Sequence, residues 1–268
     1  MFEFHADRKK YFDIQVLNAE RHVLPFISKA FTVRKGMRVL EIGCGEGGVL
    51  KVFIDKGCTC VGVDTDGARV ENAKVWLAED IREGKARFLV KDIYKVDIPQ
   101  DTGGAFDIII LKDVIEHIHD QPRLMAWMKS ILAPGGIIFF GFPPWQMPFG
   151  GHQQMCSNKW LSKLPYYHLL PSRIYRSILQ KFNEPVDDLM EIRETGLSIE
   201  YFESMVRQKE YTIVHKLHYL VNPIYEWKFG IKPLRQLPVL RDIPFLRNYI
   251  TTCVYYMITP SPSPSRVQ

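Results

Sequence analysis

The chain has 268 residues, 46% of them hydrophobic and 24% charged, which is the composition of a globular protein with a substantial core. Its formal net charge of +5 falls short of the concentrated positive charge of a nucleic-acid-binding protein, although it permits anionic substrates or an anionic membrane surface. The five cysteines are odd in number and form no C-x-x-C pair, which argues against a disulfide framework or a zinc site, and we expect no metal.

The N-terminal segment, residues 1–36, is predicted to be helical and to end at Gly36. It lacks the continuous apolar stretch of a secretory signal. The most apolar stretches of the chain, around GGIIFFGF and TTCVYYMIT, are too short to cross a bilayer. Together with the unpaired cysteines, these features predict a cytoplasmic protein without a transmembrane segment.

Short apolar strands then alternate with helices. The predicted strands lie at residues 37–43, 58–64, 86–92, 106–113 and 137–142, and the predicted helices at 47–57, 66–81 and 120–133. In the last of these helices the apolar residues form one face, and Asp120 is placed to cap it. This alternation predicts a parallel, doubly wound α/β sheet.

The alternation stops after Phe142. We predict a cap insert at 143–197, a helix that begins at Ser198, a strand at 211–220, a second insert at 221–249 and a last strand at 251–259. Four prolines in the second insert rule out one long crossover helix, so the last two strands are expected to be antiparallel neighbours. Residues 1–259 would form a single domain, followed by a disordered tail at 260–268.

The stretch VLEIGCGEGG, residues 39–48, allows two interpretations. As Gly43-x-Gly45-x-x-Gly48 it has the spacing of a dinucleotide-binding turn. As an acidic residue, Glu41, followed by alternating glycines, it suits a methyl donor instead. The glycines alone do not decide between the two.

Further segments decide between them. VGVDTD ends a strand at Asp64, 21 positions after Gly43, FLVKDI places Asp92 at the tip of the third strand, and FDIIILKDVIEHIHD is followed by the turn ILAPGG. With the glycine stretch, they resemble the class I S-adenosylmethionine-dependent methyltransferases, and in particular the small-molecule methyltransferases related to ubiquinone biosynthesis. The resemblance covers roughly residues 35–142 and 198–259. It implies a Rossmann-like, seven-stranded, mostly parallel sheet that ends in an antiparallel strand pair.

The resemblance also implies a cofactor, S-adenosyl-L-methionine, and a set of residues that bind it. Asp64 would accept the ribose hydroxyls, Asp92 the adenine amine, and the helix after the glycines would face the methionine carboxylate. The implied cofactor-binding residues are Glu41, Gly43, Cys44, Gly45, Asp64, Thr65, Asp92, Ile93 and Lys112. Cys44 is interpreted as a small filler, and Asp92 has an alternative role as a helix cap.

Two histidines are candidate catalytic bases. The resemblance places His117, in the E-H pair after the fourth strand, near the transferred methyl group, where it could take a proton from an acceptor hydroxyl. A structural role for His117 is equally open. His152 follows Gly150 and Gly151, which suggest the hinge of a lid. We expect the two inserts to form one cap over the acceptor side of the site, without an apolar core of their own.

The sequence therefore predicts a methyltransferase that acts on a small molecule, with oxygen as the favoured acceptor atom. No nucleic-acid partner is favoured, and a homodimer is left open. Two alternatives remain: a nucleic-acid methyltransferase, which should show a basic groove, and a non-catalytic protein of the same fold that binds the cofactor.

Overall fold

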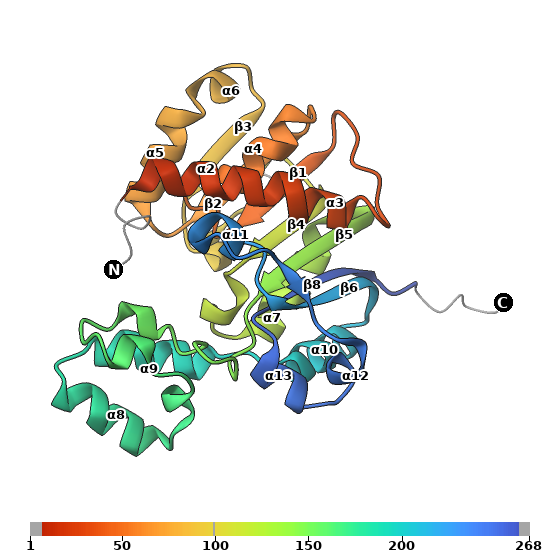
Figure 1. Cartoon of the computed structure of the whole chain (residues 1–268). Coiled ribbons are helices and arrows are strands. Elements are labelled where there is room, and N and C mark those ends of the chain that lie inside the picture. Colours follow the sequence, from red (N-terminus) through yellow and green to blue (C-terminus); the bar gives the residue numbers. More distant parts are fainter. Residues whose placement is uncertain (1–6, 99, 263–268) are drawn as a thin grey trace.

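The computed structural model describes residues 7–98 and 100–262, and its centre is one mixed sheet of eight strands (Figure 1). The strands run in the order β3-β2-β1-β4-β5-β8-β6-β7. Their bounds are β1 Arg38–Ile42, β2 Thr59–Asp64, β3 Ala86–Val90, β4 Phe106–Lys112, β5 Leu132–Phe142, β6 Tyr211–Val221, β7 Leu234–Arg235 and β8 Cys253–Pro260. The first five strands are parallel, and β8 is antiparallel to both β5 and β6. The predicted doubly wound sheet with an antiparallel C-terminal pair is confirmed.

The sheet has one strand more than the seven predicted. The additional strand, β7, has only two residues and pairs with the outer edge of β6. It lies inside the second insert, where Pro233 and Pro238 interrupt any longer strand. A two-residue strand of this kind carries no period-two pattern that the sequence could reveal.

Successive side chains of the central strands enter two different cores, one on each face of the sheet. Ile108 and Ile110 of β4 pack with α4 (Gly48–Asp55) and α5 (Gly67–Trp76). Ile109 and Leu111 pack instead with α7 (Gln121–Ile131) and α10 (Ile199–Gln208). Both faces are covered, which explains why the strands are apolar at almost every position.

The N-terminal helical segment is shorter than predicted. It consists of α2 (Arg8–Asn18), a π-helical turn (Ala19–Val23) and α3 (Leu24–Ile27), and helix does not continue to Gly36. The last turn closes with i→i+3 bonds such as Lys29 N–H to Phe26 O, which tighten the helix end. Gly36 serves the turn into β1, with a φ of +85°.

The first insert forms a body of its own beside the sheet, with α8 (Ser172–Lys181) and α9 (Val186–Thr195) at its far side (Figure 1). The N–H of Trp145 donates to the carbonyl of Leu197 at 2.8 Å, so the insert leaves and rejoins the sheet domain at one place. Its buried apolar residues form a separate cluster: Cys156, Leu161, Tyr167, Tyr175, Leu179, Leu189, Met190 and Ile192. The expectation that the inserts lack a core of their own is therefore wrong for the first insert.

The second insert divides between two neighbours. Its α11 (Tyr225–Phe229) packs on α2, while α12 (Pro238–Arg241) and α13 (Leu246–Ile250) lie beside α10 (Figure 1). The hydroxyl of Tyr166 donates to the carbonyl of Tyr249 at 3.0 Å, which joins the two inserts. Because α11 packs on α2, it is the part of the second insert near Tyr249 that contacts the first insert, and a cap built from both over the acceptor side stays a prediction. Of the predicted tail, Pro260 belongs to β8, and residues 263–268 lie outside the described part of the chain.

Candidate active site

The glycine-rich loop connects β1 to α4 at the carboxyl end of the sheet. Gly43 has a φ of +70°, and a Cβ there would lie 2.3 Å from the side chain of Val114. Gly45 has a φ of +51°, and its Cβ would lie 2.2 Å from the guanidinium of Arg69. Both positions therefore require glycine for backbone conformation and for space. The side chains of Val114 and Arg69 therefore pack directly against the backbone of the loop.

Asp64, at the tip of β2, holds this loop in place. One carboxylate oxygen accepts from the N–H of Gly45 at 2.7 Å, and the other accepts from the N–H of Asp66 at 2.9 Å. Thr65 lies exposed between the two acids, and Asp66 caps α5. Each oxygen of Asp64 keeps a second lone pair available to a hydroxyl donor.

Glu41 is buried beneath the loop, with only 3% of its surface exposed. One of its carboxylate oxygens has no hydrogen-bond partner among the described residues. Burial above all raises the pKa of Glu41 well above its usual range, and the nearby Lys112 ammonium opposes that shift. An unpartnered acid beneath the glycine loop fits a ligand that brings a positive charge or a hydrogen-bond donor.

Asp92 and Ile93 follow β3. One oxygen of Asp92 accepts from the N–H of Tyr94 at 3.0 Å and so caps the 3₁₀ turn Ile93–Lys95. The capping role that the sequence left open is therefore present, and Ile93 is buried behind it. The second oxygen of Asp92 lies 3.9 Å from Nζ of Lys95. The Asp92 side chain is 44% exposed, so this oxygen stays accessible to a ligand.

Cys44 is buried, with its sulfur against the backbone of Gly62, where a Cβ would come within 2.7 Å. Burial raises the pKa of Cys44 well above its usual range, so the thiol stays protonated. This environment agrees with the interpretation of Cys44 as a small filler.

The sequence did not single out Asp113, which lies at the end of β4. Its φ is +57°, and its carboxylate pairs with the ammonium of Lys112 at 2.5 Å. Burial works against charge on both partners, but the attraction between them raises the pKa of Lys112 and lowers that of Asp113. A non-glycine residue with this backbone conformation is uncommon and frequently marks a functional site. No sequence pattern predicts this backbone conformation of Asp113.

Glu116 is the buried neighbour of Asp113, and both of its oxygens lack partners among the described residues. Burial, and next the charge of Asp113, raises the pKa of Glu116 well above its usual range. The E-H pair of the sequence therefore contains an acid that tends to stay protonated and could donate a hydrogen bond.

The two candidate bases, His117 and His152, come together although they lie 35 positions apart in the sequence. Their ring centroids are 4.8 Å apart, with the rings tilted by 50°. Burial, assisted by the His117 ring, lowers the pKa of His152 to about 4, and its Nδ1 is buried without a partner. His117 lies on the exposed side of the pair, and desolvation lowers its pKa as well. Both imidazoles are therefore neutral near pH 7.

The loop that carries His152 rests on His168, a residue the sequence analysis did not identify. His168 is fully buried, with Nδ1 2.8 Å from the Gln153 amide nitrogen and Nε2 2.8 Å from the Trp145 carbonyl oxygen. These partners assign the proton to Nε2, because an amide nitrogen can only donate. A Cβ at Gly151 would lie 2.4 Å from His168. Gly151 is thus explained by close packing rather than by a hinge.

The first insert is also attached to the E-H loop directly. Nε2 of His119 lies 3.1 Å from a carboxylate oxygen of Glu191 in α9. The amide of Gln121 donates to the carbonyls of Ile115, at 3.0 Å, and Thr195, at 2.8 Å. Movement of α9 would therefore be transmitted to the segment that holds His117.

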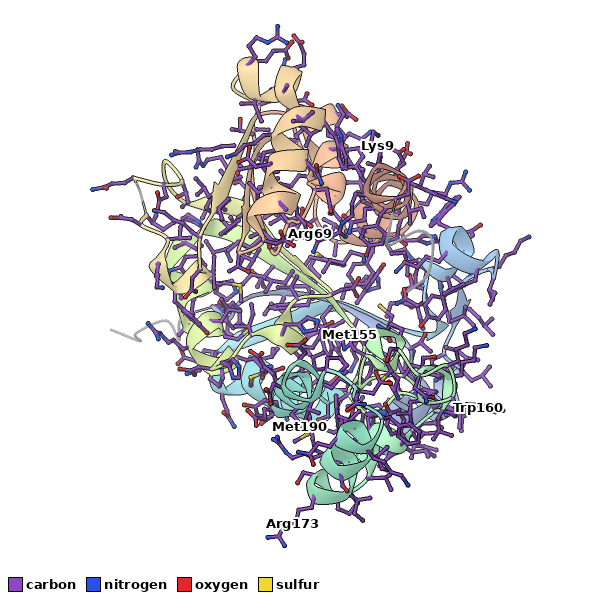
Figure 2. The ribbon with its side chains drawn as sticks, turned by 90° about the vertical axis from the view of Figure 1, so that its left-hand side faces the viewer. Lys9, Arg69, Met155, Trp160, Arg173 and Met190 are labelled. Atoms are coloured by element: carbon purple, nitrogen blue, oxygen red, sulfur yellow. The ribbon has the colours of Figure 1, made fainter. Side chains whose placement is uncertain are left out.

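A third feature absent from the sequence analysis is the buried carboxylate of Glu46 behind the glycine loop. It pairs with Arg69 of α5 at 3.0 Å and with Arg8 of α2 at 3.4 Å. Figure 2 labels Arg69 on α5 and Lys9 on the neighbouring α2. This cluster fastens the N-terminal helix over the loop.

Other kinds of site have less support in the structure. Within the described residues, no group of three or more His, Cys, Asp or Glu side chains is arranged to hold a metal ion. None of the described helices combines the length and apolar character needed to cross a membrane. A surface hollow of about 420 Å³ lies where the two inserts meet, lined by Tyr166, Leu169, Leu170, Pro171 and Tyr249.

Comparison with known proteins identifies the family. A family model described as a methyltransferase domain matches residues 16–183. A ubiquinone biosynthesis O-methyltransferase from Brucella ovis is 29% identical over 105 residues, which is 39% of this chain and 40% of that enzyme. The match thus spans about two fifths of the relative's length.

Two solved structures share the fold. Magnesium protoporphyrin IX methyltransferase from Synechocystis, solved with bound S-adenosylmethionine, has a TM-score of 0.52 at 12% identity and covers 92% of this chain and 80% of its own. A phosphoethanolamine N-methyltransferase from Haemonchus contortus has a TM-score of 0.54 at 13% identity, covering 89% and 52% respectively. With the family model spanning more than half of the chain, this protein belongs to the methyltransferase domain family, and it shares its fold with S-adenosylmethionine-dependent methyltransferases.

Proposed function

We propose that this enzyme transfers the methyl group of S-adenosylmethionine to an oxygen atom of a small molecule. The observation that carries the proposal is the meeting of His117 and His152, neutral near pH 7, at the carboxyl end of β4. A neutral imidazole with an unpartnered nitrogen is suited to accept the proton that an attacking hydroxyl loses. The match to an O-methyltransferase of ubiquinone biosynthesis, although partial, points the same way.

We assign the cofactor to the glycine loop and the strand tips beside it. The N–H groups of Gly43 and Cys44 donate to the carbonyl of Val63 and that of Gly45 donates to Asp64, so these residues would shape the loop around the cofactor. The start of α4 would face the methionine carboxylate. Asp64 and Thr65 would bind the ribose hydroxyls. The remaining assigned residues are Asp92 and Ile93 for the adenine ring and Glu41 with Lys112 beneath the methionine portion. When bound, the cofactor supplies a methyl group on a positively charged sulfur, which a nucleophile displaces.

The chain's own residues would act on the acceptor side. His152 would accept the hydroxyl proton at Nδ1 as the oxygen forms its bond to the methyl carbon. His117 would hold the His152 ring in place through their ring contact. The buried carboxyl of Glu116, whose pKa is raised by burial, could form a hydrogen bond with the acceptor. Most of the rate enhancement would come from holding oxygen, carbon and sulfur in line.

The proposal also covers the cellular location and the extent of the catalytic unit. Five buried free cysteines agree with a reducing location such as the cytoplasm. We also propose that residues 1–259 act as one catalytic unit, with the first insert as its acceptor-side wall. A nucleic-acid acceptor remains the main alternative, and a protein that binds the cofactor without catalysis is the second.

A labelled methyl group tests the proposal. The protein would be incubated with methyl-labelled cofactor and, separately, with phenols, aliphatic alcohols, amines and RNA. We expect label on a hydroxyl compound and release of S-adenosylhomocysteine. Label on RNA, or on amines alone, contradicts the proposal. Cofactor binding without label on any acceptor supports the non-catalytic alternative.

His152→Ala tests the assigned base. With an alcohol acceptor, turnover should fall by about 10² or more, while cofactor affinity stays nearly unchanged, because His152 is assigned to the acceptor side. His119→Ala is the matched control, since His119 is exposed and lies in the neighbouring loop. An equal loss in both variants would remove His152 from its role, as would a loss confined to cofactor affinity.

A further inference from the structure

One tryptophan of the first insert is almost entirely exposed. Trp160 has 86% of its surface exposed, the largest fraction among the large apolar side chains of the described residues. Figure 2 shows it at the edge of the molecule, away from the sheet. A large apolar side chain held in solvent is unfavourable unless it contacts a partner, so this position calls for an explanation.

The loop that carries Trp160 is held rigidly by hydrogen bonds. The buried carboxylate of Glu184 accepts from the N–H of Ser157 at 2.7 Å, from its hydroxyl at 3.1 Å and from the N–H of Asn158 at 2.8 Å. The side-chain oxygen of Asn158 in turn accepts from the N–H of Trp160 at 2.9 Å. The exposure of Trp160 is therefore built into the fold of the insert.

Trp160 is one of several exposed apolar side chains carried by the two inserts. We call this surface the insert face and define it by exposed side chains from both inserts: Trp160, Leu164, Tyr166, Phe245, Leu246 and Tyr249. The hydrogen bond and ring contact between Tyr166 and Tyr249 join its two halves. Phe245 has 70% of its surface exposed.

The exposed charges in the chain segment around Trp160 are basic, while the carboxylate of Glu184 is buried beneath the loop. Between Met155 and Phe182 the chain carries five basic residues and no acidic one. Four of them form no ion pair with any residue in 7–98 or 100–262, namely Lys159, Lys163, Arg173 and Lys181. Lys159 and Lys163 flank Trp160 directly.

We propose that the insert face docks on an anionic lipid bilayer. Trp160 and Phe245 would enter the headgroup region, and the flanking lysines would contact lipid phosphates. Tryptophan suits this boundary because its ring is apolar while its N–H donates a hydrogen bond. Basic residues beside a half-apolar surface add electrostatic attraction to anionic lipid. The contact is peripheral and needs no membrane-spanning helix.

The charge pattern favours a membrane over a second copy of this chain. A symmetric dimer would bring the same basic segment of each copy against the other, and like charges would repel. A bilayer containing anionic lipid instead complements those charges. The proposal does not depend on the methyl acceptor, because it rests on surface residues alone.

Flotation with lipid vesicles tests the proposal. The whole protein should float with vesicles of phosphatidylcholine and phosphatidylglycerol, not with phosphatidylcholine alone, and high salt should release it. Trp160→Glu should weaken binding at least tenfold. Replacing both Lys159 and Lys163 by Gln should weaken it about fivefold for each lysine removed. Neither change should lower the unfolding midpoint, because these side chains are exposed.

Val75→Glu is the matched control. Val75 lies on α5, away from both inserts, and is 70% exposed. Replacing this exposed apolar side chain by a carboxylate should therefore leave vesicle binding intact. Equal losses in Val75→Glu and Trp160→Glu would overturn the proposal, as would equal binding to neutral and anionic vesicles or no binding to either. A wild-type dimer in sedimentation that Trp160→Glu dissociates would overturn it in favour of a second copy.

Discussion

Asp64 has two tasks in the proposed site, and one substitution separates them. Its carboxylate receives the N–H of Gly45 and is assigned to the ribose hydroxyls. Asp64→Asn keeps an oxygen for Gly45 but removes the charge and half of the acceptor capacity. We expect affinity for S-adenosylmethionine to fall about tenfold, since a charge-assisted hydrogen bond contributes about 1.5–3 kcal/mol.

Calorimetric titration measures that affinity. Asp66→Asn, which makes the same chemical change two residues later at the cap of α5, should bind the cofactor normally. An unchanged dissociation constant in Asp64→Asn would place the ribose elsewhere.

His168 should make the protein less stable in acid. Burial lowers its pKa from the ordinary 6.5 to about 4, so between these values the unfolded chain binds a proton that the native state does not. Stability is therefore fully present above pH 6.5 and falls as pH drops toward 4. Over the whole interval the contribution lost is about 3.5 kcal/mol, because the pKa is lowered by about 2.5 units and each unit corresponds to about 1.4 kcal/mol.

Urea unfolding of wild type and His168→Gln at about pH 7 and pH 4.5 measures this effect. The difference in unfolding free energy between wild type and His168→Gln should be about 2 kcal/mol smaller at pH 4.5 than at pH 7. If this difference in unfolding free energy became larger at pH 4.5 instead, His168 would be protonated in the native state.

The candidate residues that the sequence could single out are those with a local pattern. Gly43, Gly45 and Asp64 occupy adjoining loops because a glycine-spaced turn and a strand-ending acid can each be recognised within a few residues. Asp113 and His168 could not be found in this way. Asp113 is distinguished by its positive φ and His168 by its tertiary contacts, and neither property produces a periodic pattern in the sequence.

Among the elements, the first insert should unfold partly on its own. Its apolar cluster is separate from the two cores of the sheet, and Leu179 of α8 is fully buried in it. Leu179→Ala should cost about 3 kcal/mol within the insert, from lost burial and the cavity left behind. Amide hydrogen exchange should rise in α8 and α9 while β4 and β5 stay protected.

Ile174→Ala is the control for this prediction, because Ile174 lies on the same helix with 51% of its surface exposed. It should leave exchange in the insert unchanged. Faster exchange throughout the sheet of Leu179→Ala would show instead that the insert and the sheet unfold as one unit.

The strands and α7 followed from the sequence because continuous apolar runs and a capped apolar stripe are strong local signals. The inserts did not. In the first, turns such as Gln153–Met155 and Tyr167–Leu169 are too short to show a period, and burial is decided by residues distant in sequence. The same absence of pattern hid the two-residue strand β7.

At the scale of the whole molecule, the cofactor should stabilise the fold as a unit. Its assigned residues lie on β1, β2, β3 and β4, so binding would tie the parallel half of the sheet together. S-adenosylmethionine at about a hundred times its dissociation constant should raise the unfolding free energy by about 2.7 kcal/mol. NAD, which suits the other reading of the glycine stretch, should not. Thermal unfolding with each ligand distinguishes them, and stabilisation by NAD alone would contradict the cofactor assignment.

The place of β8 in the sheet also governs how the protein is made. This strand, Cys253–Pro260, lies between β5 and β6, although both precede it in the chain. During synthesis, β1 to β5 can pair as they emerge, but β6 can pair only with the two-residue β7 until residue 260 has left the ribosome. The exposed edge of β5 must stay unpaired for that interval, which makes it the segment most open to aggregation or to a chaperone. A nascent chain stopped at residue 250 should therefore hold an unfinished sheet, and release of the last ten residues of the fold should close it.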